Sequence, residues 1–147
     1  MPVQPEERAE RERRAIHNMR QMVPSWQWNG PAIPDTKPPF GGPLVDEDGR
    51  VWVVVSQPGR PTISEEEARA EEDRTGWPQL RYKEPVVFDV FEPGGRYLGA
   101  ARPPGGFQTS PEPVIRGDTV WAVMRGDMDV PSVVRFRIVR VGPGPTG

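Results

Sequence analysis

The sequence predicts an all-β, mainly antiparallel fold with two short helical segments, and three observations support this prediction. The apolar residues include 18 Val, 5 Ile and 5 Phe but only 3 Leu, a mixture that favours strands over helices. The chain holds 20 Pro and 16 Gly among 147 residues, about twice the usual share, which requires many turns. Strand-turn-strand patterns also repeat along the chain.

The composition excludes several classes of protein and site. The chain has no cysteine and one histidine, His17, so disulfides, thiolate nucleophiles and multi-histidine metal sites are excluded. A net charge of −2 gives no electrostatic reason to expect nucleic acid as a partner. No apolar run approaches the roughly 20 residues of a membrane span. The sequence therefore predicts neither a membrane span nor a signal peptide.

Residues 1–42 predict a helix followed by a Pro-rich linker. Pro5 suits a first helical turn, and the charged pattern up to Met22 is typical of an exposed helix. We expect the helix to dock by its C-terminal half, where the apolar residues lie; a partner-binding helix is the alternative. Trp26 and Trp28 in the linker are expected to pack against a core rather than to contact a ligand.

The first group of strands, residues 43–102, contains an insertion. Residues 43–55 read as strand, turn and strand, and Asp48-Gly49 is a strong hairpin signal. Residues 58–82 interrupt the strands with a short acidic helix, residues 65–74, which Thr62 or Ser64 can cap. Strands resume at residue 84 and continue to residue 102.

The second group, residues 103–141, predicts three further strands, and residues 142–147 predict a disordered tail. Residues 51–54 (VWVV) match residues 120–123 (VWAV), and residues 88–90 (FDV) match residues 136–138 (FRI). With the insertion removed, the repeat period approaches the ~40–50 residues of a propeller blade. The match predicts equivalent structural positions, which are Trp52 and Trp121, Phe88 and Phe136, and the turn residues Asp48 and Gly49.

The pattern D-x-D-G-R, V-W-V-V and then V-F-D-V-F-x-P-G-G-R-Y-L-G resembles the blades of six-bladed β-propellers of the NHL and TolB-like type. It is most similar to the C-terminal part of such bacterial proteins. The resemblance implies a partial β-propeller of about one and three-quarter blades: residues 43–102 form one blade, and residues 103–141 form an incomplete last blade. The implied partners are the remaining blades or further copies of the chain, and the implied location is periplasmic or secreted if the whole protein is exported.

The acidic residues do not form a recognisable metal site. Asp46-x-Asp48-Gly49 looks like part of a calcium loop, but the later acids and the terminal glutamate are absent. A hairpin turn is the better interpretation, and the same holds for Asp118 and for the pair Asp127 and Asp129. The sequence predicts no metal ion and no cofactor.

The sequence also predicts no catalytic residues, because a nucleophile triad needs a histidine as its base and the one histidine, His17, lies on a charged helix where we expect it to be exposed. Relatives of the resembled family include calcium-dependent lactone hydrolases, which gather carboxylates and asparagines near a channel. This chain has only Asn18 and Asn29, and neither lies on an expected inner strand. We therefore expect a non-catalytic binding or interaction scaffold. The alternative is a fragment of a propeller hydrolase whose active site lies mostly in blades outside this chain.

Overall fold

A computed structural model describes residues 1–126 and 130–142. The pair Asp127 and Asp129, and all of the expected tail except residue 142, lie outside the described residues. The chain divides into two compact units. The first unit contains Met1–Pro39 and Ser56–Pro85, and the second contains Phe40–Val55 and the chain from Val86 on.

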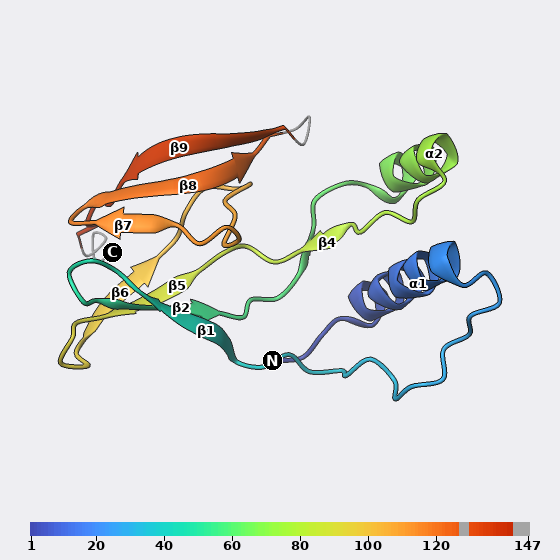
Figure 1. Ribbon diagram of the computed structural model, residues 1–147, viewed down its shortest axis with the longest axis horizontal. Coiled ribbons are helices and arrows are strands. Elements are labelled where there is room, and N and C mark those ends of the chain that lie inside the picture. Colours follow the sequence, from blue (N-terminus) through green and yellow to red (C-terminus); the bar gives the residue numbers. More distant parts are fainter. Residues whose placement is uncertain (127–129, 143–147) are drawn as a thin grey trace, which may run out of the picture. The chain divides into compact units, whose positions relative to one another are not determined.

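The described elements are two helices and short antiparallel strands (Figure 1), so the predicted all-β, mainly antiparallel class is confirmed. The helices are α1 (Pro5–Met22) and α2 (Glu65–Thr75). The strands are β1 (Phe40–Val45), β2 (Val51–Val55), β3 (Arg60–Pro61), β4 (Tyr82–Lys83), β5 (Phe88–Phe91), β6 (Tyr97–Ala101), β7 (Val114–Arg116), β8 (Thr119–Arg125) and β9 (Pro131–Arg137).

The second unit is built from two antiparallel sheets whose strands follow chain order. The first sheet has the order β1-β2-β5-β6, and the second has the order β7-β8-β9. The insertion separates β2 from β5 in sequence, yet the two strands pair directly, with Val54 opposite Phe88. Both groups of strands therefore form where the sequence predicts them, with ends that differ by a few residues.

The core of the second unit lies between these two sheets, which Figure 1 shows one above the other. It includes Trp52, Phe88 and Val90 from the first sheet, and residues 115, 120 and 122 from the second. Phe107, from the connection between the sheets, lies between Phe88 and Phe136, with ring centroids 6.0 and 5.9 Å away. Aromatic rings at such separations attract beyond their burial of apolar surface.

The turn between β1 and β2 is wider than the predicted two-residue Asp-Gly turn. Asp46 and Arg50 are joined by a backbone hydrogen bond of 3.0 Å, and the N–H of Gly49 donates to the carbonyl of Asp46 at 3.0 Å. The Asp46 carboxylate also accepts from the backbone N–H groups of Asp48 and Arg50, at 3.0 and 2.9 Å. This side-chain capture of the backbone is the reason for the wider loop, and Gly49 still adopts a positive φ of 77°.

In the first unit, helix α1 is anchored by acidic residues of its first half. Glu7 and Glu10 are buried, while residues 14–17 and 19 are half-buried, so the helix docks by its first half as well as by the expected C-terminal half. Glu10 accepts from the Nε of Arg81 at 2.6 Å, and Glu7 accepts from Lys37 at 2.6 Å. Sequence spacing places these acids on a charged helix but gives no sign of distant cationic partners.

Helix α2 begins with the predicted cap. The Ser64 side chain accepts from the backbone of Glu67, while the Glu67 side chain accepts from the backbone of Ser64, which completes a capping box. Gly76 ends the helix in the left-handed conformation, with φ 71°. The helix buries Ala68. The short pair β3-β4 lies on either side of it in sequence.

We predict that Gly106→Ala destabilises the second unit by about 2 kcal/mol or more. Gly106 has φ 88°, and a Cβ there would overlap the carbonyl oxygen of Arg125. The backbone N–H of Arg125 in turn donates to the carbonyl of Gly106 at 2.9 Å. The matched control is Gly117→Ala, where φ is 57° but the space is open, so only the backbone strain of about 1 kcal/mol remains. Equal losses in urea denaturation would show that the overlap is relieved without cost.

Candidate interaction surface

Strand pairing identifies which residues of the two sheets are equivalent. In the first sheet Leu44 and Val90 lie opposite Trp52. In the second sheet Val114 and Arg135 lie opposite Trp121. The VWVV and VWAV segments therefore occupy the same place in their sheets, namely the second strand of an antiparallel series.

Val133, and not Phe136, occupies the position in the second sheet that is equivalent to Phe88 in the first. Phe88 pairs with Val54, and the equivalent of Val54 is Val123, which pairs with Val133. The predicted match to Phe136 is displaced by three residues, and because side chains alternate along a strand, an odd displacement places the side chain on the other face. Phe136 accordingly packs against the core between the sheets.

The equivalence defines a second face, which we call the open face: Val114, Trp121, Val123, Val133 and Arg135. Its counterparts in the first sheet are residues 44, 52, 54, 88 and 90, and all of these belong to the core or pack against it. On the open face Val114 and Val133 are 49% and 73% exposed, and Val123 is half-buried. Trp121 is half-buried and alternates with the buried residues 120 and 122, so it lies on the opposite side of its sheet from the core.

Three arginines also lie on the strands of the open face, and they differ in their ion-pair partners. Arg116 donates to Glu47 at 2.7 Å, and Arg137 donates to Asp118 at 2.9 Å. The pKa of Asp118 lies below its usual value, chiefly because it accepts the hydrogen bond from Arg137. No ion pair of Arg135 occurs among the described residues, and a shallow hollow beside it is lined by residues 118, 119, 135, 136 and 137.

The predicted turn residues lie beside this face and join the two sheets. Asp48 accepts from the backbone N–H of Gly117 at 2.9 Å, while Arg50 donates to the carbonyl of Gly117 at 2.5 Å. The repeated sequence identifies Trp121 as a structurally equivalent position, but it does not identify Val114 or Val133. Only the pairing of β8 with β7 and with β9 assigns these valines to one face, because a strand pattern with a period of two does not say which face is which.

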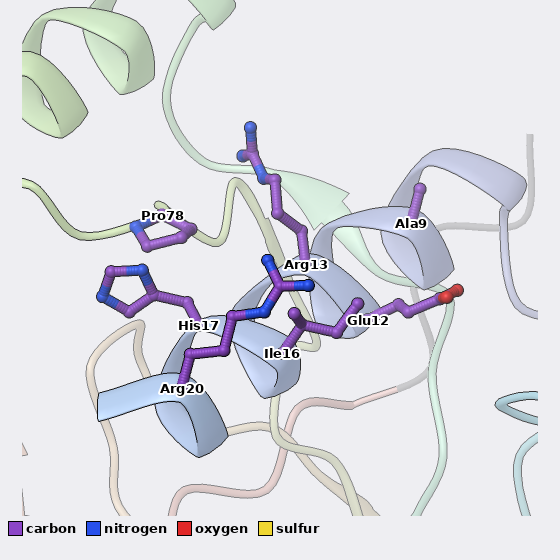
Figure 2. Close-up of a pocket in the computed structure, with 7 residues that line it drawn as sticks. All are labelled: Ala9, Glu12, Arg13, Ile16, His17, Arg20 and Pro78. Atoms are coloured by element: carbon purple, nitrogen blue, oxygen red, sulfur yellow. The ribbon is translucent and has the colours of Figure 1, made fainter. Parts of the chain in front are cut away.

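The first unit contains a hollow of about 530 Å³ along helix α1 (Figure 2). Its lining is Ala9, Glu12, Arg13, Ile16, His17, Arg20 and Pro78. His17 lies edge-on to Trp77, with ring centroids 4.6 Å apart, and its Nε2 is 3.2 Å from the side-chain nitrogen of Gln21. The single histidine is thus held by an aromatic ring and an amide.

A buried charge cluster also lies in the first unit. The Nζ of Lys37 is 2.6 Å from Glu7 and 2.7 Å from Glu84, and Arg11 lies 2.9 Å from Glu7. Burial acts to lower the pKa of Lys37, but hydrogen bonds to both carboxylates outweigh it and hold the pKa above its ordinary value. The paired charges join helix α1 to Lys37 of the linker and to Glu84, which follows the insertion.

Across residues 1–126 and 130–142, no three acidic or histidine side chains gather in a way that could hold a metal ion. Neither helix in that part of the chain has the length and apolar character needed to cross a bilayer. Comparison of the chain with protein-family models, curated proteins and solved structures finds no match.

Proposed function

We propose that the protein is a non-catalytic interaction scaffold, a partial β-propeller of the six-bladed type whose open face binds a further β-sheet. The observation that carries the proposal is the equivalence of Trp121 and Trp52. One side of each sheet has the same pattern of apolar positions, except that Arg135 stands where the first sheet has Val90, and in the first sheet that side is covered by the second. We infer that the open face of the second sheet is covered in the same way.

The directions of the two tryptophans support a propeller rather than a two-sheet sandwich. In a propeller a rotation relates successive sheets, so equivalent side chains all point the same way around the ring. Trp52 belongs to the core between the sheets, whereas Trp121 lies on the far side of the second sheet. In a sandwich with two equivalent inner faces, both tryptophans would point inward.

The covering sheet comes from the remaining blades of a longer protein or from a second copy of this chain. Strand β9 supports this proposal because no strand among the described residues pairs with its outer edge. An unpaired edge presents free backbone donors and acceptors to another chain. Val133 lies on this edge strand, and its side chain lies on the open face.

We predict that purified residues 1–147 self-associate, because Val114 and Val133 on the open face are exposed and exposed apolar side chains favour association. Size-exclusion chromatography with light scattering should give a mass well above the 16.5 kDa of one chain. Val133→Lys should shift the mass toward the monomer by placing a charge in the interface.

Val139→Lys is the matched control, since Val139 is 72% exposed and lies outside the strands. It should leave the mass unchanged. A wild-type chain that stays monomeric at all accessible concentrations would contradict self-association, and equal effects of the two variants would show that the open face is not the interface.

A further inference from the structure

The segment from Arg13 to residue 34 differs in charge from the rest of the chain. It contains three arginines and His17 but no aspartate or glutamate, although the whole chain has a net charge of −2. The same segment holds two tryptophans and two methionines. Basic, aromatic and flexible apolar residues together are typical of segments that lie at a membrane surface.

The hollow along helix α1 gathers three of these four basic residues. Arg13, His17 and Arg20 line it, and Figure 2 shows the carboxylate of Glu12 directed away from the guanidinium of Arg20. Arg13 is held by Glu72 at 2.6 Å. Arg20 uses its Nε to bind the carbonyl of Trp26 at 3.1 Å, and no ion pair of Arg20 occurs among the described residues, so its terminal nitrogens can meet an anion.

The sequence after Arg20, the last helix residue that lines the hollow, contains four apolar residues that we call the apolar tip: Met22, Val23, Trp26 and Trp28. Met22 is 71% and Val23 47% exposed, and Val23 follows the last residue of helix α1 with an extended backbone. The two indole rings meet edge to face with centroids 5.9 Å apart. Trp28 donates its N–H to two backbone carbonyls, each at 3.0 Å.

We propose that the hollow and the apolar tip together dock on an anionic lipid surface. Phosphate groups of the lipids meet Arg20, Arg13 and His17, while Met22 and Val23 enter the boundary between head groups and acyl chains. The exposed aliphatic side chains favour a lipid surface over a nucleic acid, since they have no counterpart along a phosphate backbone. The inference goes beyond the scaffold function, because it concerns the first unit and does not depend on the open face.

The test is co-sedimentation of the full chain with vesicles of phosphatidylcholine alone and of phosphatidylcholine with phosphatidylglycerol. We expect binding to the anionic vesicles only, and we expect it to weaken as salt screens the charges. Arg20→Gln should weaken binding about fivefold, the effect of one cation near a charged bilayer. Met22→Ser with Val23→Ser should weaken it at least as much.

Matched control variants test whether vesicle binding depends on this segment or on any positive charge and any exposed apolar side chain of the protein. Arg69→Gln removes one positive charge from helix α2, and Val139→Ser with Val141→Ser removes two valines that are 72% and 91% exposed and lie outside the strands; neither should change binding. Circular dichroism should give the same helix signal for all variants. Equal loss in controls and test variants would overturn the proposal.

Three further results would also overturn it. The first is equal binding to neutral and anionic vesicles. The second is release of the protein from vesicles by millimolar inorganic phosphate at constant ionic strength, which would identify a site for a free anion. The third is binding of a single-stranded oligonucleotide as tight as that of anionic vesicles, which would identify a nucleic-acid surface.

Discussion

Replacing Asp46 with alanine should destabilise the second unit by about 3–4 kcal/mol. The Asp46 side chain is fully buried, where it accepts from the indole N–H of Trp52 at 2.8 Å and from the Nε of Arg50 at 2.6 Å. The variant leaves the buried indole donor without an acceptor and leaves Arg50 with only the more distant carboxylate of Asp48, at 3.3 Å. Chemical denaturation followed by tryptophan fluorescence measures the loss.

Glu92 offers a matched control in the next hairpin. The turn from Glu92 to Arg96 has the same backbone hydrogen bonds as the turn from Asp46 to Arg50, and Glu92 also pairs with the arginine four residues on. The pair is exposed, so Glu92→Ala should have little effect on stability. Equal losses in the two variants would show that the burial of Asp46 does not matter.

Asp46 also predicts a pH dependence. Burial acts to raise the pKa of the carboxyl, but the hydrogen bonds from Trp52 and Arg50 and the charge of Arg50 outweigh it, so the folded-state pKa lies below the ordinary value of 3.8. The stabilisation is therefore complete above about pH 4 and is lost as the pH falls through the folded-state pKa. The Asp46→Ala variant should lack this part of the acid sensitivity.

The second large effect is expected for Phe88→Ala, at about 3–5 kcal/mol. Phe88 is 2% exposed and lies between Trp52 and Phe107, with ring centroids 5.8 and 6.0 Å away. Its removal opens a cavity between two sheets that each contribute to its wall. Thermal and urea denaturation should both report the loss.

Phe40→Ala is the control for the same truncation on the surface. Phe40 is 62% exposed, so the change should cost about 0.5 kcal/mol or less. If Phe88→Ala were as mild as Phe40→Ala, the two sheets would not share a common core.

Strands, hairpins and both helices could be predicted because their signals are local. Val-rich segments, glycine turns and the Ser64 cap each act within a few residues, and each forms where it is expected. The wider turn at Asp46 could not be predicted, because it depends on how one carboxylate is shared between Trp52 and the backbone.

The candidate surfaces could be predicted only in part. The repeated sequence is enough to predict Trp121. Val133 can be assigned only from the pairing of β9, because the sequence alone matches Phe88 with Phe136, which lies on the opposite face of that strand. Glu7 shows a different limit: a carboxylate in the first turn of a charged helix looks exposed, and only its distant partner Lys37 explains its burial. The propeller interpretation itself stays a prediction.

The long separation of β2 from β5 bears on the order in which the second unit assembles. Strands β1 and β2, β5 and β6, and β7 to β9 are each joined by short connections, whereas Val54 meets Phe88 only after the whole insertion has been closed as a loop. Loop closure over such a length costs about 2 kcal/mol more than a tight turn, and local contacts form first. Pairing of β2 with β5 is therefore expected to be the late step of folding, and until it happens Trp52 cannot join the core between the two sheets.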